Sequence, residues 1–318
     1  MDISIIIPAY NENDSLPELT QWIDKVMNRE GFSYEVLIVD DGSEDGSWAT
    51  IQKLNEENPK VKGVTFKRNY GKSAALYTGF QYVRGDVVVT MDADLQDSPE
   101  EIKEMRRMIL EDGYDMISGW KKKRYDPITK TIPTKLYNWA TRKMSGIYLH
   151  DFNCGLKAYR LEVVQNIEVY GEMHRYIPVI AKWRGFKKIG EKVVQHQARK
   201  YGSSKFGIER FVNGFLDLMS ITFVAKFGKK PMHFFGLMGT VMFVLGFFIS
   251  VFLGAHKLYC IYQHIEARLV TDQPFFYIAL VCMILGTQLF LAGFLAEMLS
   301  RNNANRNNYL IQDILVDE

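Results

Sequence analysis

Two long uncharged segments near the carboxyl end constrain the fold of this chain more than any other feature of its sequence. No charged residue occurs from Phe234 to Ala255, and none from Phe275 until Glu297. Each segment holds roughly 22 residues, close to the ~20 that an α-helix needs to cross a ~30 Å hydrocarbon core. Both are too long and too uniformly apolar for a buried helix of a soluble domain. The sequence therefore predicts two transmembrane helices.

Basic residues surround this pair of segments unevenly. The linker between the two segments holds only two basic residues, Lys257 and Arg268, whereas other lysines and arginines lie just outside the pair. These flanking residues are Lys226, Lys229, Lys230, Arg301 and Arg306. Such a bias places the basic ends in the cytoplasm, and the amino terminus lacks the basic region, long apolar core and cleavage site of a signal peptide. We therefore expect both termini, and the domain that precedes the segments, to be cytoplasmic.

Strand and helix patterns alternate along the first 120 residues. Strands are predicted at residues 3–10, 35–39, 61–66, 87–91 and 114–119, and helices at residues 15–29, 45–55 and 99–111, with a further helix that begins near Gly71. Such alternation predicts an α/β fold, in which helices cover both faces of a mostly parallel sheet.

Two of the predicted strands end in carboxylates. Asp92-Ala93-Asp94 follows the apolar run Val87–Met91, and Asp40-Asp41 follows Val36–Val39. Because open α/β sheets bind ligands outside the carboxyl ends of their strands, we expect these side chains to lie at a ligand site. Carboxylate oxygens are the ligands that divalent cations such as Mg²⁺ take in phosphate-binding sites. The pattern therefore predicts a cation that binds phosphate groups.

The segment Asn69-Tyr70-Gly71-Lys72 opens a predicted helix. Free N–H groups at a helix start, together with a lysine, favour an anion. A glycine turn with a solvated lysine is about equally good on local grounds, and the position after a third strand favours phosphate.

The overall charge and the cysteine content bear on nucleic-acid binding and on cysteine-based sites. A net charge of +2 gives no general reason to expect nucleic-acid binding. The three cysteines Cys154, Cys260 and Cys282 form neither a zinc spacing nor a disulfide framework.

Four motifs occur in order along the first 100 residues: Ile5-Ile6-Ile7-Pro8-Ala9-Tyr10-Asn11-Glu12, Val39-Asp40-Asp41-Gly42-Ser43, Asn69-Tyr70-Gly71-Lys72 and Asp92-Ala93-Asp94-Leu95-Gln96. With them the chain resembles family 2 glycosyltransferases, which have the nucleotide-sugar-binding GT-A fold, Rossmann-like with a mostly parallel sheet. The segments His150–Arg160 and Arg199–Lys205, with the two apolar segments, are similar to the polyprenyl-phosphate branch. That branch includes dolichol-phosphate mannose synthase and undecaprenyl-phosphate glucosyltransferases. The Gln-x-x-Arg-Trp motif of processive polysaccharide synthases does not occur.

The resemblance implies a metal-dependent, inverting transfer of a single sugar from a UDP- or GDP-linked donor to polyprenyl (undecaprenyl) phosphate. It implies that Asp94 is the main protein ligand of Mg²⁺ or Mn²⁺, with Asp92 beside it, and that Lys72, Arg199 and Lys205 contact the diphosphate. The full set of residues expected to bind the nucleotide-sugar is Pro8, Tyr10, Glu12, Asp40, Asp41, Lys72, Asp92, Gln96, Arg199 and Lys205.

A lipid monophosphate is largely anionic at neutral pH, so its positioning should matter more than a strong general base. Lys121, Arg124 and Arg142 are the candidates for binding that phosphate. Asp151 matches an acidic residue that acts in this branch as base or orienting group, and we count it as catalytic with Asp94. A structural carboxylate at a turn is an equally good interpretation of Asp151.

These features divide the chain into four parts. We expect a cytoplasmic GT-A catalytic domain at residues 1–206, an amphipathic juxtamembrane helix at 207–230, a transmembrane hairpin at 231–300 and a cytoplasmic tail at 301–318. The apolar face of the juxtamembrane helix favours the membrane interface, and packing against the core is the alternative.

The resemblance also implies partners. We expect a bacterial inner-membrane protein in contact with membrane lipid, a homo-oligomer such as a tetramer, and a flippase and a downstream glycosyltransferase in cell-envelope glycan synthesis or modification. Two alternatives stay open: transfer to another lipid or lipid-linked saccharide, and a non-catalytic scaffold that binds a nucleotide-sugar. The motifs fix neither the sugar nor the base.

Overall fold

The computed structural model describes residues 1–122, 138–139, 141–197, 200, 231–266, 268–302 and 311–315. They belong to two compact units, Met1–Ile221 with Arg306–Glu318 and Thr222–Asn305. Arg124, Arg199, Lys205 and the expected juxtamembrane helix at 207–230 lie outside the described residues.

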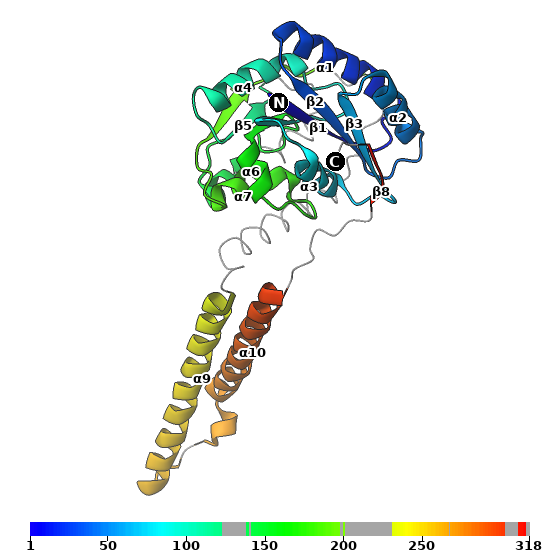
Figure 1. Ribbon diagram of the computed structural model, residues 1–318. Coiled ribbons are helices and arrows are strands. Elements are labelled where there is room, and N and C mark those ends of the chain that lie inside the picture. Colours follow the sequence, from blue (N-terminus) through cyan, green and yellow to red (C-terminus); the bar gives the residue numbers. More distant parts are fainter. Residues whose placement is uncertain are drawn as a thin grey trace. The chain divides into compact units, whose positions relative to one another are not determined.

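A twisted sheet of eight strands forms the centre of the first unit, in the order β7-β5-β6-β4-β1-β2-β3-β8 (Figure 1). The pairs β1–β2, β1–β4, β2–β3 and β5–β7 are parallel, whereas β6 is antiparallel to β4 and β5, and β8 to β3. The predicted mostly parallel sheet is therefore confirmed. The strands are β1 (Ile3–Ala9), β2 (Tyr34–Asp40), β3 (Val61–Phe66), β4 (Val87–Thr90), β5 (Met116–Trp120), β6 (Lys157–Arg160), β7 (Ile189–Val193) and β8 (Ile311–Leu315).

Helices cover both faces of this sheet because its central strands are apolar on both sides. In β1, Ile5 and Ile7 belong to one core cluster, with Leu19 of α1, and Ile6 belongs to the other, with Phe80 of α3. Successive side chains of a strand point to opposite faces, so one strand supplies both clusters. The helices are α1 (Leu16–Glu30), α2 (Ser47–Glu57), α3 (Lys72–Tyr82), α4 (Ile102–Leu110), α6 (Leu161–Asn166) and α7 (Ile177–Trp183), with 3₁₀ turns η1 (Pro99–Glu101) and η2 (Met173–Tyr176).

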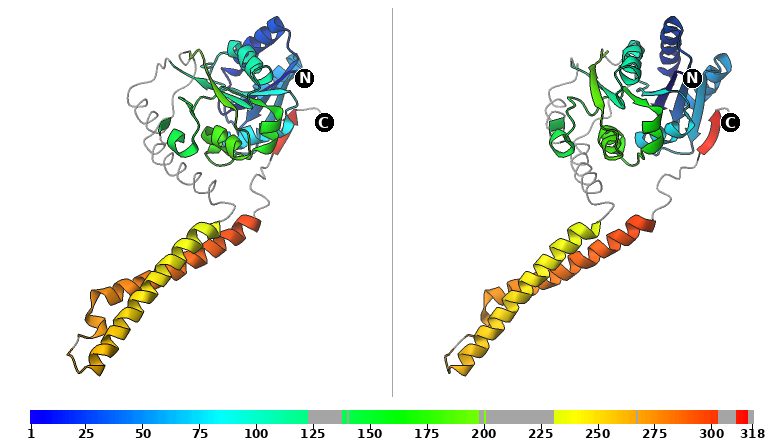
Figure 2. Two further views of the ribbon diagram at one scale, coloured as in Figure 1. Left: turned by 90° about the vertical axis from the view of Figure 1, so that its left-hand side faces the viewer. Right: turned by 60° about the vertical axis from the view of Figure 1, so that its left-hand side comes forward.

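The second unit is a pair of long helices, α9 (Pro231–Tyr262) and α10 (Pro274–Asn302), joined by a linker that contains the 3₁₀ turn η3 (Val270–Asp272). Both helices are long and apolar enough to cross a membrane, and most of their surface is exposed within the structure. They lie side by side in both views of Figure 2. A Cβ on Gly286 would lie 2.6 Å from the backbone nitrogen of Phe243, and one on Gly246 would lie 2.5 Å from the carbonyl oxygen of Ala279. Glycines thus let the two backbones approach closely, as in many membrane helix pairs.

The carboxyl-terminal segment returns to the first unit as β8, which pairs with β3 through Gly63–Leu315 and Thr65–Asp313. Leu315 packs against the core cluster that contains α1. Both views in Figure 2 show β8, in red, at the outer edge of the sheet. The sequence patterns did not predict this strand, which lies within the segment 301–318 that we expected to be a tail.

Candidate active site

The carboxyl ends of β1, β2 and β4 meet at one edge of the sheet, because Ala9 pairs with Asp40 and Ile6 pairs with Thr90. A cleft of about 300 Å³ opens at this edge. It is lined by Pro8, Ala9, Tyr10, Glu12, Asp41, Asn69, Gly71, Lys72, Asp92, Ala93 and Asp94. The structure therefore brings together, from four separate motifs, most of the described residues that the sequence singled out for the nucleotide-sugar.

Asp40 and Asp41 shape the loops around the cleft. Asp40 is buried and accepts hydrogen bonds from the hydroxyl of Thr65, at 2.8 Å, and from the hydroxyl of Ser43. Asp41 accepts from the backbone N–H groups of Tyr70, at 2.7 Å, and Gly71, at 2.8 Å. Burial raises the pKa of Asp41 to about 6, although these two N–H groups favour its charged form. Asp41 thus fixes the turn that leads to Lys72.

Asp92 and Asp94 lie on the loop that follows β4. The Asp92 carboxylate forms an ion pair with the Lys72 ammonium. Burial opposes ionisation of Asp92, but the charges of Lys72 and Lys121 outweigh it and lower the pKa of Asp92. Asp94 is buried, and one of its oxygens accepts a hydrogen bond from the Gln96 backbone at 3.2 Å. Both carboxylates are therefore held as acceptors at the cleft.

These two carboxylates suit a divalent cation that is shared with a bound diphosphate. Among the described residues there is no group of three or more His, Cys, Asp or Glu side chains that could hold a metal. Mg²⁺ commonly takes one or two protein carboxylates and completes its shell with phosphate oxygens and water. The donor set of Asp92 and Asp94 fits that mode of binding.

Backbone geometry supports the same loop. Leu95 has φ 59°, a left-handed conformation that is uncommon for leucine, and its side chain is buried. A Cβ on Gly155 would lie 2.4 Å from an Asp92 carboxylate oxygen. Glycine at position 155 therefore leaves room for the Asp92 side chain.

Gln96 does not line the cleft but connects its loop to a later segment. Its carbonyl oxygen accepts from the Gln197 N–H at 2.9 Å, and Asp97 forms a β-bridge with His196. The chain just before Arg199 is thus anchored beside the Asp92–Asp94 loop.

Lys121, expected at the acceptor phosphate, forms an ion pair with the fully buried Asp97, with 2.7 Å between the Nζ and Oδ1 atoms. Burial would lower the pKa of Lys121, but the charge of Asp97 raises it. Neither Asp97 oxygen has a hydrogen-bond partner of good geometry in the described part of the chain. The Lys121 charge is therefore the main compensation for burying this carboxylate.

Two further expected residues lie outside the cleft. The Nε atom of Arg142 donates to the Asn138 carbonyl at 3.4 Å, a contact along its own helical segment. Asp151 is buried, and its Oδ1 atom accepts from the Asn153 N–H at 3.0 Å. Asp151 thus stabilises the turn ahead of β6.

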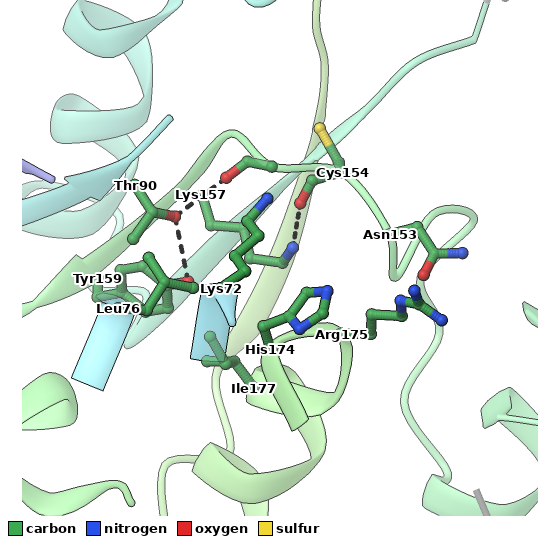
Figure 3. A pocket seen from close by; sticks show the side chains of 11 residues that line it. Lys72, Leu76, Thr90, Asn153, Cys154, Lys157, Tyr159, His174, Arg175 and Ile177 are labelled. Atoms are coloured by element: carbon green, nitrogen blue, oxygen red, sulfur yellow. Dashed lines mark hydrogen bonds between the residues drawn. The ribbon is translucent and has the colours of Figure 1, made fainter. Parts of the chain in front are cut away.

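A second, much smaller cavity of about 20 Å³ adjoins the cleft, with Lys72 in the walls of both (Figure 3). Its polar lining includes Thr90, Asn153, Lys157, His174 and Arg175. The sequence analysis assigned no site role to any of these five. Asn153 and Lys157 lie inside the segment His150–Arg160. His174 and Arg175 belong to no motif, and their only signal in the sequence is that two basic side chains are adjacent.

The model of the family described as Glycosyl transferase family 2 matches residues 4–168. Dodecaprenyl-phosphate galacturonate synthase of Rhizobium johnstonii is 32% identical over 100% of this chain and 94% of its own length. Undecaprenyl-phosphate 4-deoxy-4-formamido-L-arabinose transferase of Pseudomonas aeruginosa is 34% identical over 94% of this chain and 85% of its own length.

Solved structures show the same fold at low sequence identity. Mannosyl-3-phosphoglycerate synthase from Rubrobacter xylanophilus aligns with a TM-score of 0.58 and 16% identity over 71% of this chain and 75% of that one. Glucosyl-3-phosphoglycerate synthase from Mycobacterium tuberculosis, in complex with Mn²⁺, UDP and phosphoglyceric acid, aligns with a TM-score of 0.54 and 16% identity over 70% and 78%.

Proposed function

The chain belongs to glycosyl transferase family 2, and from this premise we propose that it transfers one sugar from a nucleotide-sugar to the phosphate of a polyprenyl phosphate. It is a glycosyltransferase with the expected GT-A fold, and its relatives are polyprenyl-phosphate sugar transferases. The observation that best supports the proposal is the cleft at the strand ends, which is lined by Asp92 and Asp94 together with Asp41 and Lys72.

In this proposal the donor lies along the cleft. Its nucleoside contacts Pro8, Tyr10 and Glu12, and its diphosphate lies near Lys72 and the carboxylate pair, all of which line the cleft. Asp94 and Asp92 would hold Mg²⁺ or Mn²⁺, and Mn²⁺ accompanies UDP in a solved structure with this fold. When bound, the ion neutralises charge on the leaving diphosphate. Lys72 adds a fixed positive charge at the same place.

The transfer is a single displacement that inverts the anomeric carbon. An oxygen of the lipid phosphate attacks that carbon, the bond from the carbon to the donor phosphate breaks, and the nucleoside diphosphate leaves with the electron pair. A phosphate oxygen is already anionic, so the chain needs to position it rather than remove a proton from it. We assign Asp151 to orienting the turn before β6, since its carboxylate accepts the Asn153 N–H.

We further propose that α9 and α10 cross a membrane as a hairpin, with the catalytic domain and both ends in the cytoplasm. Their length and apolarity, and the basic residues that flank them, support this topology. Three expectations stay predictions from the resemblance: a location in the bacterial inner membrane, a tetramer, and association with a flippase or a downstream glycosyltransferase.

The test is a reaction of the purified full chain with undecaprenyl phosphate, Mg²⁺ or Mn²⁺ and a panel of UDP- and GDP-sugars, with the lipid product identified by mass. We expect a lipid-phosphate-sugar from one donor, and no product from Asp94→Ala. Asp112→Ala is the matched control, because Asp112 is a partly exposed carboxylate paired with Arg107 on the surface. Donor binding without any lipid product would contradict the proposal and favour a scaffold or another acceptor.

A further inference from the structure

The second cavity lies beside the donor cleft, and the proposed function does not yet give it a ligand. Its walls come from the start of α3, the end of β4, the approach to β6 and the 3₁₀ turn η2. In Figure 3 the side chains of Lys72, Lys157 and His174 project into one space, with Arg175 and Asn153 at its far side. These groups come from segments far apart in the sequence, and the fold brings them to a single place beside the donor cleft.

The charge of this cavity favours an anion. Lys72, Lys157 and Arg175 supply positive charge, His174 adds a titratable ring, and none of the described residues that line the cavity is acidic. The carboxylate of Glu172 lies 3.8 Å from Arg175, but Glu172 is half exposed. Lys72 is already paired with Asp92, whereas Lys157 is only 4% exposed. Because burying a cation is costly, a bound anion would stabilise the charged form of Lys157.

Hydrogen bonds hold the cationic groups in place. The hydroxyl of Ser73 accepts from the His174 N–H at 3.0 Å and lies 3.2 Å from the His174 Nδ1 atom. The turn η2 is thereby attached to the first turn of α3, which keeps Arg175 and Lys72 on the same cavity. The Arg175 side chain is only 13% exposed, so its guanidinium is held in a restricted space.

Lys157 forms part of the cavity wall from β6. Its side chain is buried, and its ammonium donates to the Cys154 carbonyl. An ammonium has three N–H donors, so others are available for an anion. At the same wall the Thr90 hydroxyl donates to the Gly155 carbonyl at 3.0 Å, which fixes the backbone next to Lys157.

We propose that this cavity binds the phosphate of the polyprenyl phosphate acceptor, with Arg175 and Lys157 as its main charged partners and Asn153 as a neutral donor. The inference rests on the proposed function and names the acceptor site for it. A phosphate monoester carries about −1.5 to −2 charges at pH 7 and has three strong acceptor oxygens, which matches a cluster of cationic donors. Lys72 belongs to both cavities, so the acceptor oxygen would lie next to the donor diphosphate.

The acceptor is favoured over the donor for two reasons. The donor cleft is the larger of the two, about 300 Å³ against about 20 Å³, and it already has the carboxylates for a metal–diphosphate. An uncharged sugar does not require several cations, whereas a phosphate does. A carboxylate on the donor sugar is the other anion that fits, and the experiment separates the two.

The first measurement is equilibrium binding of undecaprenyl phosphate, and of undecaprenol as the lipid without phosphate, to the full chain in detergent without donor. We expect the wild type to prefer the phosphate. Arg175→Gln should weaken undecaprenyl phosphate binding by roughly tenfold to a hundredfold, the usual loss for removal of a charged hydrogen-bond partner, and leave undecaprenol binding unchanged. Arg184→Gln is the matched control, because Arg184 is exposed and lies at the end of α7.

A second variant guards against local unfolding of η2. Asn153 is exposed, so Asn153→Asp changes little besides charge and should also weaken phosphate binding, by repulsion. Steady-state kinetics should show a higher KM for undecaprenyl phosphate in both variants, with an unchanged KM for the donor. Unchanged lipid binding in both variants, a wild type that does not prefer the phosphate, or a rise only in the donor KM would overturn the inference. A wild type that prefers the phosphate but makes no lipid product would refute the proposed function alone.

Discussion

Replacement of Lys121 by methionine should destabilise the catalytic domain strongly, because it leaves the Asp97 carboxylate buried without its cation. Asp97 is 0% exposed and lies 2.7 Å from the Lys121 ammonium. At an effective dielectric of ~20, charges this close attract by ~6 kcal/mol. Part of that energy offsets desolvation, and an isolated Asp97, whose pKa burial already raises, would take up a proton. The net cost of breaking a buried pair is therefore about 3–5 kcal/mol.

That loss corresponds to a fall of about 6–20 °C in the Tm of a domain of this size. Thermal unfolding of the full chain in detergent, followed by tryptophan fluorescence, measures it. Lys122→Met is the matched control: Lys122 is exposed and lies next in sequence, so its loss should change stability by less than about 0.5 kcal/mol.

A double variant distinguishes a structural ion pair from an acceptor site. Lys121→Met combined with Asp97→Leu replaces the pair by apolar groups, which is often nearly neutral. The double variant should regain most of the lost stability, which requires a coupling energy of at least about 3 kcal/mol between the two positions, and it should keep its KM for undecaprenyl phosphate. Equal Tm values for Lys121→Met and Lys122→Met, with a higher KM for undecaprenyl phosphate in Lys121→Met, would instead place Lys121 at the acceptor phosphate.

Three further predictions concern single positions. The pKa of Asp41 is raised from 3.8 to about 6, so its protonated form stabilises the fold at low pH, and that contribution disappears as pH rises through about 6. Denaturant unfolding at a series of pH values should show that the stability advantage of wild type over Asp41→Asn shrinks from pH 4 to 7. A difference between the two proteins that does not change with pH would contradict this. Gly155→Ala would displace the Asp92 carboxylate and should raise the Mn²⁺ concentration needed for half-maximal turnover by roughly tenfold, whereas Gly254→Ala, which meets open space, should not. Gly286→Leu would separate α9 from α10 and should lower the stability of the hairpin by about 1–3 kcal/mol in thermal melts, with Gly254→Leu as the control; equal melting of the two would disprove the close approach.

The sheet and the donor cleft could be predicted because their signals are local. Alternating strand and helix patterns give the parallel sheet, and the strand ends at Asp40 and Asp92 mark its binding edge. In a parallel sheet these strand ends lie at the same edge, so the binding edge can be predicted without knowing which distant residues are in contact.

The remaining features depend on contacts that no local pattern specifies. The pairing of β8 with β3 joins Ile311 and Phe66, and an edge strand of five residues has little signal of its own. Lys121 looks like part of a solvated basic run until the fold places Asp97 beside it. Arg175 and Lys157 become a site only because η2 is hydrogen-bonded to the start of α3.

The position of β8 also determines the order in which this molecule can be completed. A chain emerges from its amino end and its domains form as units during synthesis, but β8 follows α10 in the sequence. The outer edge of β3 therefore stays unpaired until both long helices have been made. An open edge is a template for pairing with other chains. Completion of the sheet thus waits for synthesis of both long helices, and a chain truncated before β8 would retain the exposed edge permanently.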